Sequence, residues 1–168
     1  MIEVLRLDHR PQRDARLTTH VALVSRAFGA SKIYYSGQQD PSLENSIKKI
    51  TKNWGGSFKI EYIKNPLKLL QTKKTIIHLT MYGLPIQKKI SEIRKQRNLL
   101  IVVGGSKVPI QYYKLSNFNI SIINQPHSEV SSLSILLHKY FKGKELSINF
   151  KNAKLKIIPQ EQGKKLKS

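Results

Sequence analysis

Short apolar runs alternate with amphipathic segments over most of the chain. Six runs of four to seven residues are rich in Ile, Leu, Val or Tyr and predict strands. These runs are Met1–Leu7, Lys32–Tyr35, Phe58–Ile63, Thr75–Leu79, Leu99–Val103 and Ile120–Ile123. The segments between them, and the one after the last run, predict helices where apolar residues recur at helical spacing. Regular alternation of strands and helices is typical of an α/β fold with a mostly parallel sheet and helices on both faces.

Pro and Gly mark several boundaries of the predicted helices. In the first helix, which covers Val21–Phe28, Thr18 or Thr19 is expected to cap the N-terminus and Gly29 to end the helix. The other predicted helices are Pro41–Trp54, Pro66–Leu70, Pro85–Lys95, Ile110–Leu115 and Glu129–Tyr140.

The segment Leu99–Tyr140 combines two buried strands with two polar, turn-rich loops. The first loop is Gly104–Pro109 and the second is Asn124–Val130. Carboxyl ends of parallel strands meet at one edge of an open α/β sheet, where ligands bind, so a small-molecule site is expected here. Gly104-Gly105-Ser106-Lys107 matches neither the P-loop nor the dinucleotide fingerprint, and a tight turn remains the alternative for it.

The second loop has a structural and a functional interpretation. Ser128 as the N-cap of a helix, with Glu129 in its first turn, would account for part of its polarity. His127 lacks an acidic residue at a spacing that would suggest a catalytic triad. It is therefore expected to be structural or to position a substrate.

Composition narrows the function classes. The 168 residues suffice for one ordinary domain with a real core, and 30 Lys and Arg against 10 Asp and Glu give a net charge of +20. Such an excess favours contact with a polyanion such as RNA, although a Lys-rich source organism is the alternative.

The absence of Cys excludes thiol nucleophiles and Cys-ligated metals, and the five His show no zinc-binding spacing, so no metal is expected. No apolar run approaches the ~18 residues of a membrane span and no signal-peptide pattern is present, which predicts a cytoplasmic protein without a membrane partner.

Two basic regions stand out. Arg10, Arg13 and Arg16 lie in the polar segment Asp8–Arg16, expected as a loop at the carboxyl end of the first strand. Guanidinium groups suit bidentate phosphate contacts, whereas a solvated loop is the alternative. After residue 143 the pattern changes to two extended pieces, Leu146–Phe150 and Lys154–Ile158, and a Lys-rich tail. We therefore predict a domain over residues 1–143 and a basic C-terminal extension over residues 144–168.

Three stretches together resemble one protein family. They are Asp8-His9-Arg10-Pro11-x-Arg13-Asp14-x-Arg16-x-Thr18-Thr19-His20, His78-Leu79-Thr80-Met81-Tyr82-Gly83 and Asn124-Gln125-Pro126-His127-Ser128-Glu129-Val130. The sequence is similar, from about Val4 to its end, to the archaeal tRNA cytidine-56 2′-O-methyltransferases of the SPOUT superfamily. The resemblance implies a homodimeric enzyme that methylates a T-loop ribose of tRNA, and a C-terminal deep trefoil knot, which connection rules alone would not suggest. A non-catalytic basic RNA-binding protein is the alternative.

The resemblance also implies a site. S-adenosyl-L-methionine would lie among the loop after Leu79 and two further loops. The cofactor-binding residues it implies are Leu79, Gly104, Gly105, Ser106, Lys107, Val108, Ile122, Ile123, Asn124, Gln125, Pro126, His127, Ser128 and Glu129. The RNA-binding residues that the resemblance implies are Arg10, Arg13, Arg16 and His20. Arg16 is expected to be catalytic, with Arg13 and Arg10 as alternatives. Because Arg is not deprotonated in proteins, it is expected to orient a phosphate or stabilise the forming alkoxide rather than act alone as a base.

Overall fold

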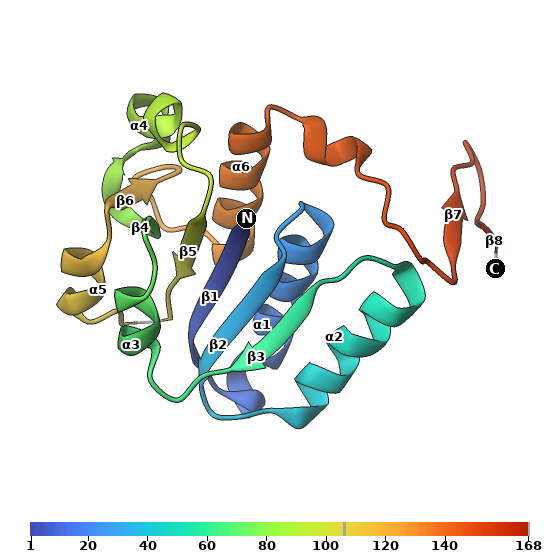
Figure 1. The fold of residues 1–168 in the computed structure, drawn as a ribbon, viewed down its shortest axis with the longest axis horizontal. Coiled ribbons are helices and arrows are strands. Elements are labelled where there is room, and N and C mark those ends of the chain that lie inside the picture. Colours follow the sequence, from blue (N-terminus) through green and yellow to red (C-terminus); the bar gives the residue numbers. More distant parts are fainter. Residues whose placement is uncertain (106, 168) are drawn as a thin grey trace.

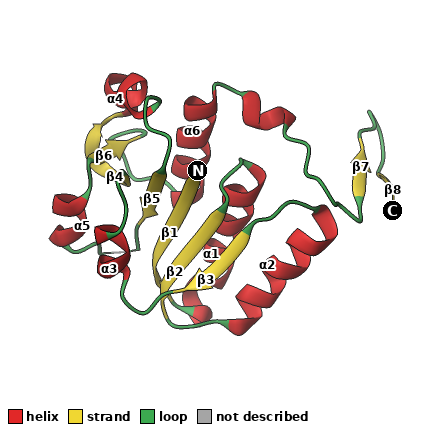
Figure 2. Cartoon of the chain, viewed as in Figure 1, coloured by secondary structure: helices red, strands yellow, loops and turns green. Residues whose placement is uncertain are grey.

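The computed structural model describes residues 1–105 and 107–167, with the side chains of all of these except residues 14 and 15. Strands and helices alternate through the first 141 residues, as Figures 1 and 2 show. The elements are β1 (Ile2–His9), α1 (Pro11–Ala27), β2 (Lys32–Gly37), α2 (Pro41–Trp54), β3 (Lys59–Tyr62), α3 (Pro66–Gln71), β4 (Ile76–Pro85), α4 (Ile86–Ile93), β5 (Leu99–Val103), α5 (Ile110–Leu115), β6 (Phe118–Ser121), α6 (Glu129–Phe141), a 3₁₀ helix η1 (Lys144–Ser147), β7 (Lys156–Ile158) and β8 (Lys165–Lys167).

Six strands form one sheet in the order β3-β2-β1-β5-β4-β6, and every neighbouring pair is parallel. Alternate residues of the central strands face two separate cores: Val4 and Ile101 lie in one, Leu5 and Leu100 in the other. Helices α1, α2, α4 and α6 contribute to the first core, and α3 and α5 cover the second. The predicted parallel sheet with helices on both faces is confirmed, and the central strand β5 is apolar at every position because both of its faces are buried.

The start of α1 corrects one prediction. The helix begins at Pro11, so the stretch expected as a loop forms its first turns, and neither Thr18 nor Thr19 is its cap. Pro is favoured at the first helical position because its φ is already close to the helical value and it has no N–H to leave unpaired. Pro11 therefore indicates the start of this helix, and the prediction placed the start too late because it took Thr18 or Thr19 as the cap. The Thr18 side chain instead lies buried against His9.

The β4–β6 pair corrects a second prediction. Instead of ending at Leu79, β4 continues to Pro85, and both Leu79 and Leu84 pair with Ile120 of β6. Residues 80–83 therefore bulge out of the ladder. The backbone at Gly83 passes so close to β6 that a Cβ there would come within 2.6 Å of backbone atoms of Asn119 and Ile120. Strand β6 itself lies two residues earlier than expected, which leaves residues 122 and 123 in the following loop.

The C-terminal segment packs against the ends of α1 and α2. The N–H of Gly56 donates to the carbonyl of Lys151 at 2.8 Å, and the N–H groups of Lys154 and Leu155 both donate to the carbonyl of Asn53 at 2.9 Å. Residues 144–147 form a 3₁₀ helix, so the extended piece expected over Leu146–Phe150 is wrong for its first residues. The chain ends in the small antiparallel hairpin of β7 and β8 (Figure 1).

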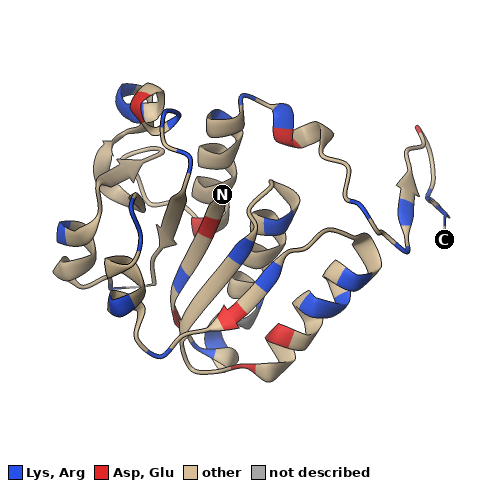
Figure 3. Ribbon diagram, in the orientation of Figure 1, with Lys and Arg blue, Asp and Glu red and all other residues tan. Residues whose placement is uncertain are grey.

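Basic residues dominate the charged positions of the fold. Figure 3 shows Lys and Arg on α2, α4 and the C-terminal segment, with the few Asp and Glu separated from one another.

No helix in the described part of the chain is long and apolar enough to cross a membrane. Within the same residues, no group of three or more acidic, His or Cys side chains is placed to hold a metal ion.

A buried polar cluster joins the carboxyl ends of β1 and β2. The fully buried His9 ring contacts the Thr18 hydroxyl through Nδ1 at 2.8 Å and a carboxylate oxygen of Asp40 through Nε2 at 3.2 Å. Asp40 also caps α2, because its other oxygen accepts from the N–H of Leu43 at 3.0 Å. The hydroxyl of Tyr35 accepts from the N–H of Asp40 at 2.9 Å. These contacts tie the start of α1 to the start of α2.

We expect Asp40→Asn to lower the free energy of unfolding by about 1 kcal/mol at neutral pH, because the charged hydrogen bond to His9 is lost while the cap is kept. The pKa of Asp40 is lowered, mainly by the N–H of Leu43 and further by His9, against the opposing effect of burial. A lowered folded-state pKa contributes stability above the unfolded pKa of about 4, and this stability is lost as the pH falls through the folded pKa.

Urea unfolding at pH 7 and at pH 3 measures this effect. The difference between wild type and Asp40→Asn should shrink at pH 3. Glu61→Gln is the matched control, because the Glu61 side chain is 54% exposed and its pair with Lys32 is screened by solvent. A difference for Asp40→Asn that stays constant between the two pH values would contradict the prediction.

Candidate functional site

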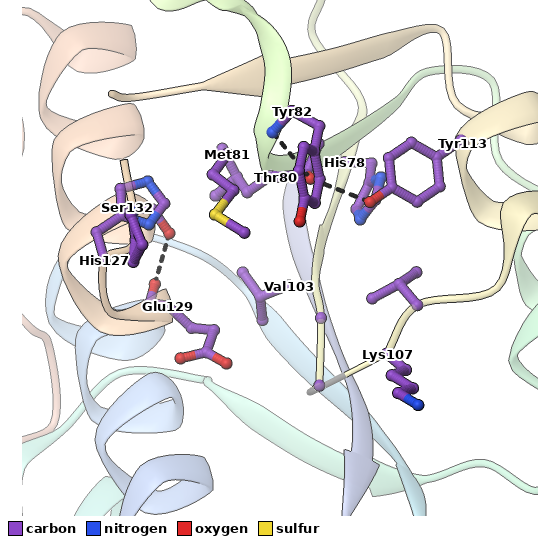
Figure 4. Close-up of a pocket in the computed structure, with 15 residues that line it drawn as sticks. His78, Thr80, Met81, Tyr82, Val103, Lys107, Tyr113, His127, Glu129 and Ser132 are labelled. Carbon is purple, nitrogen blue, oxygen red and sulfur yellow. Dashed lines mark hydrogen bonds between the residues drawn. The ribbon is translucent and has the colours of Figure 1, made fainter. Parts of the chain in front are cut away.

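A cavity of about 460 Å³ opens at the carboxyl end of β5 and of the part of β4 that pairs with it. Its walls come from three parts of the chain that are distant in sequence: the bulge of β4, the loop after β5, and the start of α6 with the loop before it (Figure 4). This volume is in the range of small-molecule and cofactor sites. The position agrees with the expected ligand site at this edge of the sheet.

The wall after β5 is formed by the backbone at Gly104 and Gly105. A Cβ at Gly104 would come within 2.5 Å of the Val108 side chain, so the loop is too tightly folded there for a larger residue. Arg6, which is 1% exposed, donates from Nη1 to the carbonyl of Gly104 at 2.6 Å and also to that of Leu7. A buried guanidinium from the central strand therefore holds this loop in place.

The β4 wall carries a histidine in a defined tautomer. Asn119 donates from Nδ2 to the carbonyl of Tyr113 at 2.9 Å, which orients its Oδ1 toward Nδ1 of His78 at 3.0 Å. His78 Nδ1 is therefore the donor, and its Nε2 carries a lone pair for which the described residues offer no hydrogen-bond partner. Burial lowers the pKa of His78, against the smaller opposing effect of the Asn119 hydrogen bond, so the ring is neutral at neutral pH.

Aromatic and hydroxyl groups complete this wall. The ring of Tyr113 meets the His78 ring edge-on at 4.5 Å between centroids. Its hydroxyl lies 3.2 Å from the hydroxyl of Thr80, and the N–H of Tyr82 donates to the same Thr80 oxygen at 3.4 Å (Figure 4). These hydrogen bonds hold the bulge of β4 against α5.

The loop before α6 is joined to the bulge of β4 by the side-chain amide of Asn124. Asn124 donates from Nδ2 to the carbonyls of Met81 and Gly83, at 2.7 and 3.1 Å. At the start of α6 the Ser128 hydroxyl accepts from the N–H of Val130 at 3.1 Å, which confirms Ser128 as the N-cap. Nε2 of His127 is buried without a hydrogen-bond partner among the described residues, and the ring lines the cavity.

The cavity brings together eight of the residues predicted to bind the cofactor. They are Leu79, Gly104, Gly105, Lys107, Val108, Pro126, His127 and Glu129. Five others lie in the same loops without lining it: Ile122, Ile123, Asn124, Gln125 and Ser128. Ser106 lies outside the residues that the structure describes. The cofactor role of all these residues stays a prediction.

Seven lining residues were missing from that set. They are His78, Thr80, Met81, Tyr82, Val103, Tyr113 and Ser132. The His78–Gly83 stretch contains the first four, but ending the strand at Leu79 hid the bulge that turns them toward the cavity. Ser132 lies one helical turn after Glu129, to whose carbonyl its hydroxyl donates at 2.9 Å, so helical spacing would have indicated it.

The residues predicted to bind RNA lie on α1, apart from the cavity lining. Arg10 is at the N-cap position, and Arg13, Arg16 and His20 are exposed. The spacing of three and then four residues places the last three side chains on one face of the helix. This exposed basic face begins at the carboxyl edge of the sheet, the same edge at which the cavity opens.

The fold matches those of solved RNA-modifying enzymes. The fold matches the A. aeolicus TrmH/SpoU tRNA modifying enzyme with a TM-score of 0.63 at 14% identity, over 86% of this chain and 76% of that one. It matches the SpoU methyltransferase AviRb from Streptomyces viridochromogenes, solved in complex with AdoMet, with a TM-score of 0.63 at 10% identity, over 88% of this chain and 58% of that one. The fold is therefore that of the SPOUT methyltransferases.

Sequence comparison identifies the family within this class. Residues 54–167 match the family described as tRNA ribose 2′-O-methyltransferase, aTrm56. The tRNA (cytidine(56)-2′-O)-methyltransferase of Sulfurisphaera tokodaii is 50% identical over 167 residues, which cover 96% of this chain and 98% of the relative. The enzyme of the same name from Thermococcus kodakarensis is 47% identical, over 99% and 96% of the two chains. The chain belongs to the archaeal tRNA ribose 2′-O-methyltransferase family.

Proposed function

We propose that this protein transfers a methyl group from S-adenosylmethionine to the ribose 2′-hydroxyl of cytidine 56 in tRNA. The observation that carries the proposal is the three-walled cavity between the bulge of β4 and the carboxyl end of β5, in a chain that aligns over nearly its whole length with enzymes of that name. The basic face of α1 supports a nucleic-acid substrate beside it.

The cavity fits the cofactor. Leu79, Val103 and Val108 offer apolar surface for the adenine ring, and the two glycines let a flat ring approach the backbone closely. Among the described lining residues, Glu129 is the acidic one, and its carboxylate suits a cationic ligand. The unpartnered Nε2 of His127 is a further polar atom for the ligand's hydroxyl and amino groups.

Positioning accounts for most of the chemistry asked of the protein. When bound, S-adenosylmethionine supplies a methyl group already activated by its sulfonium, so little covalent help is required. Holding the hydroxyl in line with that methyl group can contribute on the order of 7–11 kcal/mol of the barrier. The hydroxyl proton would pass to solvent water as the methyl group leaves sulfur for the ribose oxygen, and negative charge would develop on that oxygen during the transfer. We assign the stabilisation of that charge to Arg16, whose guanidinium stays protonated.

Three further properties belong to the same proposal. Membership of the family and the exposed apolar side chains Ile123 and Ile135, at the loop before α6 and on α6, support a homodimer, to be checked by a sedimentation mass twice that of one chain. The family also implies a deep trefoil knot. Its tRNA substrate supports a location in the cytoplasm.

A methylation assay with an unmodified tRNA transcript and labelled S-adenosylmethionine tests the function. We expect label in the RNA, mapped to cytidine 56, and no label in a transcript with a 2′-deoxyribose at that position. Isothermal titration should show binding of S-adenosylmethionine in the absence of RNA. A protein that binds tRNA but neither binds the cofactor nor transfers a methyl group would support the non-catalytic RNA-binding alternative.

A further inference from the structure

A second groove lies at the far end of α2 from the candidate active site. It has a volume of about 500 Å³ and is formed between Trp54, the last residue of α2, and residues 148–157 of the C-terminal segment. Helix α2 runs from the carboxyl edge of the sheet to its opposite edge (Figure 1). Its 14 residues span roughly 21 Å, so the groove is well separated from the edge at which the methyl transfer is proposed to occur.

The walls of this groove are held rigidly. Arg26 of α1 donates from Nη2 to the carbonyls of Trp54 and Gly55, at 2.8 and 2.7 Å, and its guanidinium lies 4.5 Å from the centre of the Phe150 ring. A Cβ at Gly55 would come within 2.5 Å of the carbonyl oxygen of Lys151, so the two segments touch backbone to backbone. These contacts fix the two sides of the groove relative to each other, so the groove is a defined part of the fold.

The chemistry of the lining suits a nucleobase. Trp54 is half-buried and offers an indole for stacking, while the exposed side chains of Asn149 and Asn152 offer amide donors and acceptors for a base edge. Lys156 also lines the groove. The described lining contains no acidic residue.

The surrounding charge favours a polyanion over another protein. Residues 144–167 contain seven Lys and two Glu, and one of these, Glu145, is buried and bonded to His138 at 2.6 Å. This basic surface would repel the same surface of a second copy, whereas it would attract RNA phosphates.

We propose that the groove between Trp54 and residues 148–157 binds an unstacked nucleotide of the tRNA, remote from the methylated ribose. The base stacks on Trp54, the two asparagines contact its edge, and Lys156 contacts the adjoining phosphate. This inference rests on the proposed function for the identity of the RNA. It gives the C-terminal extension a role in gripping the substrate, separate from the chemistry.

Trp54 is the single tryptophan of the chain, so its fluorescence reports on this groove alone. Titration of the full chain with unmodified tRNA transcript should quench the fluorescence to saturation. Heparin, a polyanion without bases, should bind without that quenching. Equal quenching by heparin, or none by tRNA, would overturn the proposal. A change that follows protein concentration without RNA would place a second copy in the groove and would also overturn it.

Substitution separates base stacking from charge and from folding. Trp54→Ala should raise the KM for tRNA about tenfold, the effect of losing one stacked base, with kcat and cofactor affinity unchanged. Trp54→Phe should restore most of the affinity. Asn149→Ala removes an exposed side chain and tests the groove without risk to the fold, and it should raise KM while Lys49→Ala, outside the groove, should not.

Failure of this proposal is distinguishable from failure of the proposed function. Unchanged KM values for both groove variants in an active enzyme would refute the groove and leave the methyltransferase function standing. Base-dependent quenching in a protein that transfers no methyl group would refute the function and leave the groove as an RNA site.

Discussion

Replacing Arg16 with alanine is expected to lower kcat for tRNA methylation by at least about 100-fold, the size of effect seen when one group that stabilises a developing oxyanion is removed. The side chain is exposed on α1 and does not line the cofactor cavity, so the dissociation constant for S-adenosylmethionine should stay within about twofold of wild type. Single-turnover methylation with saturating tRNA and a separate cofactor titration measure the two quantities.

Two variants on the same helix control this experiment. Arg13→Ala removes an equal charge one turn earlier and should raise the KM for tRNA with little change in kcat. Arg16→Lys keeps the charge but not the planar fork of donors, and should recover only part of kcat. Full activity of Arg16→Ala, together with inactive Arg13→Ala, would move the catalytic role to Arg13.

Gly83→Ala is expected to destabilise the fold strongly. A Cβ there would come within 2.6 Å of three backbone atoms of Asn119 and Ile120, and β6 has little room to yield because Ile120 pairs with both Leu79 and Leu84. Inserting a methyl group into such a contact is expected to lower the free energy of unfolding by about 3 kcal/mol, the upper end of the usual range for overpacking. That loss would lower Tm by about 6–12 °C in a protein of this size. Thermal unfolding followed by circular dichroism measures the shift.

Gly105→Ala is the matched control for this prediction. Its nearest contacts are the Cβ and a carboxylate oxygen of Asp8, at 3.1 and 3.2 Å, and no backbone atom lies closer than 3.5 Å, so a shift of a few tenths of an ångström would relieve them. We expect a change in stability below about 1 kcal/mol. Equal shifts in Tm for the two variants would show that the approach of Gly83 to β6 is not a tight contact.

The sheet and its helices could be predicted from the sequence because local patterns determine them. The run Leu99–Val103 is apolar at every position, which requires a strand covered on both faces, and it is the buried β5. The two loops after the last strands could likewise be placed at one edge. Both lie beside the cavity, because parallel strands bring their carboxyl ends together.

The bulge of β4 could not be predicted in the same way. Whether the chain continues in the sheet after Leu79 depends on pairing with Ile120, some 40 residues later, and local propensity does not contain that contact. The same dependence on distant residues hid the start of α1. Thr18 lies within the helix and its hydroxyl contacts His9, which in turn contacts Asp40, so a residue type that often caps helices is here a buried hydrogen-bond partner.

Strand β1 connects the two halves of the proposed site mechanically. Within four residues it carries Arg6, which holds the Gly104 loop, and His9, which contacts Thr18 two residues beyond Arg16. The wall of the methyl-donor cavity and the helix that presents the acceptor's arginine are thus anchored to one central strand, most of whose side chains are buried. A shift of β1 along its own axis would move both anchors in the same direction. The alignment of donor and acceptor would therefore depend less on thermal motion of the sheet than if two separate strands carried the anchors.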